Sequence, residues 1–230
     1  MAPYPKEFDH LDAAVNRLTS LLNKEKVRHI FIGGYATCLL GGARVTEDVD
    51  LITEKECRKY LLESGDFTVS TDNRLAFRYR DKVVHIDILI TGRWRDTSCD
   101  VPLPRKLNTY LVAPRDCPER RLHDHVPIMH PSALVLSKLK PWGLADRATR
   151  MEFHMRCRTD LMDIKTILQW LVENGMEVQY SLVSEIPKQD LLPLLSRLYR
   201  KEPTLRGLMA EAFSPDDLLD VLKYQSKRCT

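Results

Sequence analysis

The sequence lacks the features that mark membrane and secreted proteins. No stretch of its 230 residues approaches the ~20 consecutive apolar residues of a membrane helix. The start of the chain, which contains two closely spaced prolines, has no apolar core of the secretory type. We therefore expect a protein of the cytoplasm or the nucleus, with no membrane partner.

Paired cysteines are missing as well. The six cysteines are widely spread, and none stands in a CxxC spacing. We interpret them as reduced thiols rather than as a disulfide framework. A chain of this length buries roughly 70–75% of the surface that its unfolded form exposes, so a hydrophobic core can stabilise it without cross-links.

The sequence also lacks a strong charge of one sign. Its formal net charge is only +3, which by itself does not predict nucleic-acid binding. Basic residues nevertheless gather in two stretches, residues 93–121 and 147–158. Such stretches either form solvated loops or contact the phosphates of a nucleotide or polynucleotide, and both interpretations stay open here.

The spacing of apolar residues predicts a protein that mixes helices and strands. Apolar residues recur at helical spacing in residues 7–24, which predicts an amphipathic helix. Short apolar or alternating runs predict strands at residues 30–32, 48–53, 67–70, 74–80, 82–90, 109–112 and 126–129. Further helices are expected at residues 35–40, 54–63, 131–140, 161–171 and 191–199.

The chain changes character near residue 130, where strand patterns give way to helical ones. We expect an α+β fold, with a mixed β-sheet flanked by helices in residues 1–130 and a helical C-terminal region in residues 131–230. Asp81-Lys82 is expected to form a tight turn between two strands. Ser214 is expected to cap the last helix, which has acidic residues in its first turn.

Two glycines, Gly33 and Gly34, follow the first predicted strand and lead into a helix. Glycine lets a phosphate approach the backbone closely. The N-terminus of a helix adds a favourable partial positive charge. Standing alone, the glycine pair is more typical of a simple turn than of a phosphate site.

Asp48 and Asp50 are two residues apart on a predicted strand, so their side chains point to the same face of the sheet. Val49 and Leu51 point to the other face and can enter the core. Two carboxylates on one face repel each other unless a cation lies between them. Hard cations such as Mg²⁺ prefer oxygen ligands and bind through a few carboxylates together with substrate phosphates.

Asp87 interrupts the strongly apolar run of residues 83–90. Burying a carboxylate without a partner is costly, so this side chain needs one. On a neighbouring strand it would join Asp48 and Asp50 around one or two metal ions. The alternative is an aspartate that is exposed at an edge or held in a salt bridge.

These residues together resemble the signature of the DNA polymerase β-type nucleotidyltransferase superfamily, and in particular its minimal and abortive-infection-type branch. The signature spans residues 33–87, which is about a quarter of the chain. It consists of the glycine pair, the carboxylate pair, the third carboxylate and three residues between them, Gly42, Arg44 and Thr46. The resemblance implies a nucleotidyltransferase-like catalytic domain in residues 1–130.

The resemblance also implies roles for individual residues. Asp48, Asp50 and Asp87 would bind two Mg²⁺ ions, for which Mn²⁺ can substitute, and Asp87 would act as base or position the attacking hydroxyl. The nucleotide would contact Gly33, Gly34, Tyr35, Arg44, Thr46, Lys138 and Lys140. Tyr35 stands where many members carry serine. Arg44 has the alternative of pairing with Glu47, and the two lysines have the alternative of lying in solvent.

The expected activity is a Mg²⁺-dependent transfer of an NMP, from ATP or another NTP, to an unidentified hydroxyl acceptor with release of pyrophosphate. The acceptor could be a tRNA, a protein or a small molecule. One alternative is a catalytically inactive nucleotide-binding or regulatory module of the same fold. Another is a metal-dependent glycosyltransferase, which would leave the glycine pair and Asp87 unexplained. The sequence indicates no oligomeric state.

Overall fold

The computed structural model describes residues 8–43, 46–91, 106–146, 151–183 and 186–226. These residues form two compact units. Among the described residues, the first unit comprises residues 8–39, 43, 46–91 and 106–129, and the second comprises residues 40–42, 130–146, 151–183 and 186–226. No helix in the described part of the chain is long and apolar enough to cross a membrane.

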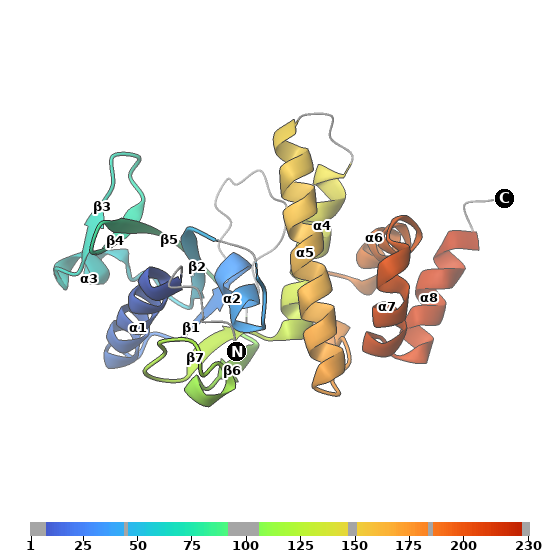
Figure 1. Cartoon of the computed structure of the whole chain (residues 1–230), viewed down its shortest axis with the longest axis horizontal. Coiled ribbons are helices and arrows are strands. Elements are labelled where there is room, and N and C mark those ends of the chain that lie inside the picture. Colours follow the sequence, from blue (N-terminus) through green and yellow to red (C-terminus); the bar gives the residue numbers. More distant parts are fainter. Residues whose placement is uncertain (1–7, 44–45, 92–105, 147–150, 184–185, 227–230) are drawn as a thin grey trace. The chain divides into compact units, whose positions relative to one another are not determined.

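The first unit is built on a mixed sheet of seven strands (Figure 1). The strands are β1 (His29–Ile32), β2 (Asp48–Thr53), β3 (Phe67–Val69), β4 (Leu75–Tyr79), β5 (Lys82–Ile90), β6 (Thr109–Val112) and β7 (Val126–Met129). Their order across the sheet is β3-β4-β5-β2-β1-β7-β6. The pairs β2–β5 and β1–β7 are parallel, and the other neighbours are antiparallel.

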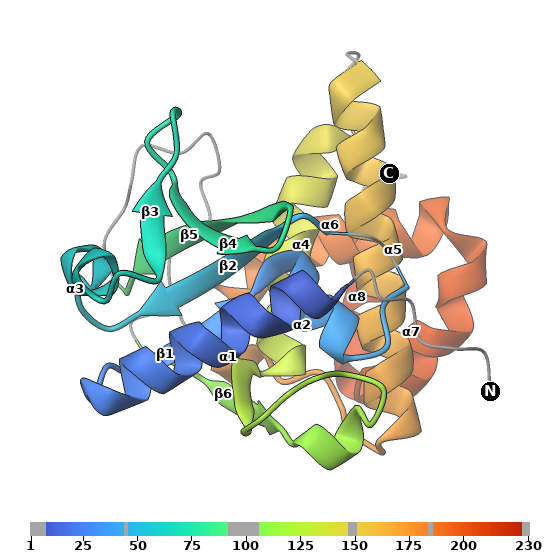
Figure 2. The ribbon, with the colours of Figure 1, turned by 60° about the vertical axis from the view of Figure 1, so that its left-hand side comes forward.

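Among its described residues, the α-helices of this unit are α1 (Asp9–Lys24), α2 (Gly33–Leu39) and α3 (Arg58–Glu63). Figure 2 shows α1 lying across one face of the sheet. Its apolar positions Leu11, Val15, Leu18 and Leu22 are all fully buried, as the helical spacing predicts. Each such side chain stabilises the fold by about 1.5–3 kcal/mol relative to an exposed one. The central strands are buried as well, so α1 and the sheet enclose one core.

The hairpin of β4 and β5 turns one residue earlier than the sequence suggests. Tyr79 pairs with Lys82, so the two turn residues are Arg80 and Asp81 rather than Asp81 and Lys82. Arg80 adopts a left-handed conformation with φ of 56°, which lets the chain reverse within two residues. This register places Leu75 opposite Ile86 and thereby decides which side chains lie beside Asp87.

Helices are the regular secondary structure of the second unit, within its described residues. Its α-helices are α4 (Pro131–Ala145), α5 (Met151–Glu173), α6 (Lys188–Lys201), α7 (Arg206–Ala212) and α8 (Pro215–Ser226). Helix α4 begins at Pro131 as predicted but continues through Pro141, where the buried Trp142 anchors the following turn. Ser214 caps α8, because its Oγ accepts a hydrogen bond of 3.2 Å from the backbone N–H of Asp217. The short helix α7 was not expected from the sequence pattern.

Candidate active site

Three carboxylates of the first unit converge at neighbouring strands of the sheet. In the parallel ladder of β2 and β5, Asp50 is the register partner of Asp87, and Asp48 lies opposite His85. Because side chains alternate between the faces of a strand, all three aspartates project from the same face. One oxygen from each of Asp48, Asp50 and Asp87 lies within 4.8 Å of the others.

This arrangement fits a hard divalent cation. Mg²⁺ binds oxygen at 2.0–2.1 Å, so two oxygens on one ion lie roughly 3–4 Å apart. The observed spacing therefore needs only small side-chain rotations to surround an ion. All three aspartates are half-buried, which leaves one side open for further ligands from a substrate. The donor set consists of oxygens alone, as Mg²⁺ and Mn²⁺ prefer.

Gly33 brings the backbone at the start of α2 against Asp50. It has a φ of +68°, in the left-handed region that favours glycine. A Cβ at this position would lie 2.2 Å from Asp50 Oδ2, which no real pair of atoms tolerates. A residue with a side chain would therefore have to displace the carboxylate. Gly34, which follows it, is buried.

Thr46 supports Asp48 from the segment just before β2. Its hydroxyl donates a hydrogen bond of 3.1 Å to Asp48 Oδ1, and its side chain is almost fully buried. The hydroxyl predicted to contact the nucleotide is thus engaged in orienting a carboxylate. Gly42 is half-buried, and Arg44 lies outside the described residues.

Tyr35 lies entirely within the core of the first unit. Its hydroxyl donates a hydrogen bond of 2.9 Å to Asp12 Oδ1, and burial raises the pKa of Tyr35 well above its ordinary value. Asp12 is in turn paired with the buried guanidinium of Arg120, whose Nε donates to Asp12 Oδ1 at 3.0 Å. The ring therefore has no exposed face on which a base could stack, and it anchors α2 to α1 instead.

Arg74 contacts the carboxylate cluster, although its sequence context did not single it out. Its Nε and Nη2 donate hydrogen bonds of 3.2 and 2.7 Å to the two oxygens of Asp87. Nη2 also lies 3.6 Å from Asp48 Oδ2. The hydrogen bonds to Asp87, followed by attraction to the neighbouring aspartates, raise the pKa of Arg74 despite the opposing effect of burial. Asp87 thus belongs to the cluster and forms a salt bridge at the same time.

The two lysines expected near the nucleotide belong to α4 in the second unit. Lys138 Nζ lies 2.7 Å from Asp163 Oδ2 and 3.6 Å from Asp160 Oδ1, both on α5. Both aspartates are buried, and burial raises the pKa of Asp160. The charge of Lys138 is therefore balanced inside its own unit, which gives these two aspartates a structural role. Lys140, two residues on, is half-buried.

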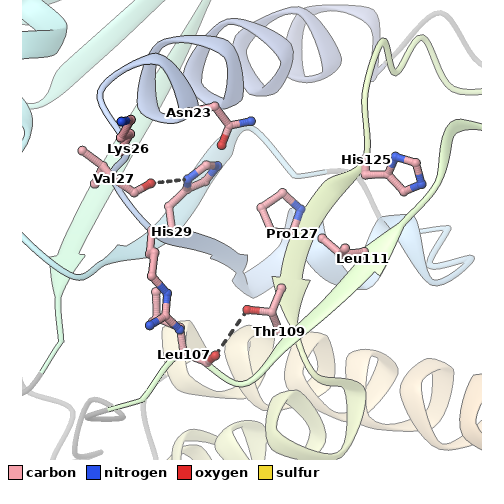
Figure 3. Close-up of a pocket in the computed structure, with 10 residues that line it drawn as sticks. Asn23, Lys26, Val27, His29, Leu107, Thr109, Leu111, His125 and Pro127 are labelled. Carbon is pink, nitrogen blue, oxygen red and sulfur yellow. Dashed lines mark hydrogen bonds between the residues drawn. The ribbon is translucent and has the colours of Figure 1, made fainter.

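A separate pocket of the first unit lies at the opposite end of β1 (Figure 3). His29 begins this strand, whereas Ile32 ends it and pairs with Asp50. The His29 ring is buried and its Nδ1 lies 3.0 Å from the carbonyl oxygen of Val27, and burial lowers the pKa of His29. Lys26, Arg28 and His125 also line the pocket. None of the residues that the resemblance assigns to the nucleotide or the metal lines this pocket.

The structure is similar to that of a known protein with the expected fold. It matches a nucleotidyltransferase-like protein from Paracoccidioides brasiliensis with a TM-score of 0.65 and 20% sequence identity, over 90% of this chain and 94% of that chain. The chain therefore has a nucleotidyltransferase-like fold. This confirms the predicted α+β class and the fold that the resemblance implies.

More distant similarities are weaker. The antibiotic-resistance factor ANT(2'')-Ia matches with a TM-score of 0.42 and 12% identity, over 86% of this chain and 95% of that chain. Among curated proteins, the bifunctional purine biosynthesis protein PurH of Ruminiclostridium cellulolyticum is 37% identical over 95 residues. That match covers 39% of this chain and only 18% of PurH. No protein-family model matches the chain.

Proposed function

We propose that this chain is a Mg²⁺-dependent nucleotidyltransferase. It transfers an NMP from ATP or another NTP to a hydroxyl acceptor and releases pyrophosphate. The observation that carries the proposal is the convergence of Asp48, Asp50 and Asp87 within 4.8 Å. They converge beside Gly33, in a nucleotidyltransferase-like fold.

In this proposal the three aspartates hold two Mg²⁺ ions, for which Mn²⁺ can substitute. The ions, when bound, stabilise the attacking and the leaving oxygen of the displacement. Asp87 positions the acceptor hydroxyl or accepts its proton. The hydroxyl oxygen forms a bond to the α-phosphorus while the bond from that phosphorus to the α–β bridging oxygen breaks. Pyrophosphate leaves with the electron pair of the broken bond.

The chain contributes chiefly by holding these groups in place before the nucleotide arrives. Thr46 orients Asp48, and the bare backbone of Gly33 leaves room for Asp50. Groups that are fixed in advance lose little entropy in the reaction and need little reorganisation. The main chain of Gly33 and Gly34 is proposed to lie against the triphosphate, with Arg44 as a further phosphate contact.

The domain division follows from the same proposal. Residues 1–130 form the catalytic domain, and residues 131–230 form a helical region. A tRNA, a protein hydroxyl and a small molecule are the three classes of acceptor to be tested. The basic stretches at residues 93–121 and 147–158 favour an acceptor that carries phosphate.

The direct test is pyrophosphate release. The protein is incubated with each NTP, labelled on the α-phosphate, in Mg²⁺ or Mn²⁺, with total tRNA, an aminoglycoside panel or a cell extract. Label should move to one acceptor class, and Asp50→Asn and Asp87→Asn should each lower the rate at least about a hundredfold. Asp81→Asn, in the exposed β4–β5 turn, is the matched control and should retain the activity.

Two outcomes would contradict the proposal. Full activity in both aspartate variants would remove the carboxylates from the reaction. Binding of ATP by calorimetry, with no transfer to any acceptor, would favour the inactive nucleotide-binding module instead.

A further inference from the structure

We infer that Arg74 is a built-in counter-cation of the aspartate cluster. When a nucleotide binds, the guanidinium leaves Asp87 and contacts the phosphates of the nucleotide. Metal binding at Asp87 therefore depends on nucleotide. This inference rests on the proposed function and adds to it a residue that controls access to the metal site. It follows from how Arg74 is held, from what its guanidinium contacts and from the charge of the cluster.

The backbone of Arg74 is firmly held at the edge of the site. Its carbonyl oxygen accepts hydrogen bonds of 2.9 Å from both the backbone N–H and the hydroxyl of Ser70. The preceding residue, Asn73, has a left-handed φ of 62°, and its carbonyl accepts a bond of 2.7 Å from Arg58 Nη2. Arg74 immediately precedes β4, which places it opposite Asp87 when the ladder with β5 is extended by one pair.

The guanidinium, in contrast, is held only by carboxylates among the described residues. Its two hydrogen bonds occupy both oxygens of Asp87, and its other close charged contact is Asp48 at 3.6 Å. The side chain is 33% exposed, and those of Asp48 and Asp87 are 43% and 44% exposed. The head group can therefore leave Asp87 by rotating its own side chain, without moving the strand.

The charge of the cluster explains why Arg74 lies there and why it would leave. Three carboxylates within 4.8 Å of one another repel, and one guanidinium relieves part of that repulsion. A divalent cation uses the same oxygens and carries more charge in a smaller volume. It would repel the guanidinium a few ångströms away, so the two cations compete for Asp87.

A nucleoside triphosphate changes this competition. Its phosphates offer the planar guanidinium a bidentate partner that is equivalent to a carboxylate. In the exchange, the guanidinium moves from Asp87 to phosphate while Asp87 becomes available to the metal that accompanies the nucleotide. Without nucleotide, the site would thus bind metal weakly at Asp87. Nucleotide and metal would each strengthen the binding of the other.

The test measures binding rather than turnover. Mn²⁺ affinity is determined by electron paramagnetic resonance for the full chain and for Arg74→Gln, Arg74→Lys and Arg78→Ala. Each protein is measured with and without an ATP analogue whose α–β bridge cannot be cleaved. Arg78 is the matched control, because it is an exposed arginine on β4, the strand that Arg74 immediately precedes. Thermal unfolding verifies that each variant is folded.

Without nucleotide, Arg74→Gln should bind Mn²⁺ about fivefold more tightly than the parent chain, since the competing half-exposed ion pair is gone. With Mn²⁺ present, the same variant should bind the analogue about tenfold more weakly, because it lacks the bidentate phosphate contact. Arg74→Lys keeps the charge without the planar fork, so it should retain the parent Mn²⁺ affinity but lose affinity for the analogue. Arg78→Ala should match the parent chain in both measurements.

Equal or weaker Mn²⁺ binding by Arg74→Gln without nucleotide would overturn the inference while leaving the proposed function intact. A parent chain that binds no Mn²⁺, with or without the analogue, would instead overturn the metal centre on which the proposed function rests. The two failures are therefore distinguishable in one set of measurements.

Discussion

Asp50 Oδ2 lies where a side chain at Gly33 would begin, so the carboxylate and the glycine share one small volume. Gly33 opens α2 directly after β1, and Ile32, the last residue of β1, is the register partner of Asp50. The glycine therefore serves two needs at once. It supplies the left-handed turn from strand to helix, and it leaves space for a carboxylate of the cluster.

The first prediction separates these two needs. Gly33→Ala should lower the free energy of unfolding and abolish pyrophosphate release, because the new Cβ displaces Asp50. Gly65→Ala is the control, since Gly65 also has a positive φ, of +78°, but a Cβ added there would meet no atom within 4 Å. Both variants should lose roughly 1–2 kcal/mol of stability from the left-handed backbone. Urea unfolding and the release assay check this, and an active Gly33→Ala protein would argue against the site.

The second prediction follows from the repulsion within the cluster. In EDTA and at low salt, Asp48→Asn should raise the free energy of unfolding by about 0.5–1 kcal/mol, because it removes one of three neighbouring negative charges and weakens only a long contact of 3.6 Å with Arg74. Asp87→Asn should give a smaller gain, since it weakens the closer salt bridge of 2.7 Å with Arg74. The gain should shrink in 1 M salt, where exposed charges are screened. Thermal unfolding of the three proteins at both ionic strengths measures it, and a destabilised Asp48→Asn would contradict it.

Strand and helix positions in the first unit were predictable because their signals are local. The apolar spacing of α1, the alternation in β2 and the apolar run in β5 each report on their own segment. The convergence of the aspartates followed from the same patterns, once β2 and β5 were taken as neighbours. The positions of the three aspartates could thus largely be predicted from the sequence, whereas their roles in binding metal and nucleotide stay predictions.

Arg74 shows how a one-residue error in the predicted position of a turn can hide a site residue. With a turn at Asp81-Lys82, the hairpin would pair Arg80 with Val83, and Asp87 would face Ala76. The observed pairing of Tyr79 with Lys82 shifts the β4 side of the ladder by two residues, so that Asp87 faces Arg74 instead. The turn requires a left-handed φ at Arg80, and arginine is not among the residues that typically indicate such a turn.

The network of Asp12, Tyr35 and Arg120 was beyond sequence reasoning for a different reason. Asp12 and Arg120 are 108 positions apart, and nothing local to either indicates the other. Tertiary packing brings α1 against the segment that leads to β7. Tyr35, which the sequence alone connects with the phosphate, makes a buried contact with Asp12 that no local pattern indicates.

The third prediction concerns that network. Arg120→Met should lower the free energy of unfolding by about 3–5 kcal/mol, because it leaves Asp12 as a buried charge without its partner. The cation also lies 4.6 Å from the ring centre of Phe8 and 5.1 Å from that of Tyr35, so these contacts are lost too. Arg121→Ala is the control. Its ion pair with Asp9 is 3.3 Å long, but its side chain is 64% exposed, so the loss should be at most about 1 kcal/mol. Equal losses in urea unfolding would refute the distinction.

The fourth prediction concerns the pH dependence of stability in the second unit. Burial raises the pKa of Asp160, against the attraction of Lys138 and Arg156, so the folded state holds this proton more tightly than the unfolded state. The stability that comes from this proton is present below the unfolded pKa of about 3.9 and is lost as pH rises through the folded pKa. At pH 7 the charged form is therefore a cost. Its Oδ2 is buried and has no hydrogen-bond partner among the described residues, which agrees with that cost.

Asp160→Asn should accordingly be more stable than the parent chain at pH 7, and the difference should disappear as the pH falls below about 4. Asp163→Asn is the matched comparison on the same helix. It removes the closer partner of Lys138, at 2.7 Å, and leaves a mostly buried ammonium with only the longer contact to Asp160, so it should destabilise the fold at pH 7. Urea unfolding of the three proteins between about pH 3.5 and 7.5 tests both signs. A loss of stability at pH 7 in Asp160→Asn would mean that the 3.6 Å contact to Lys138 outweighs the cost of burying the charge.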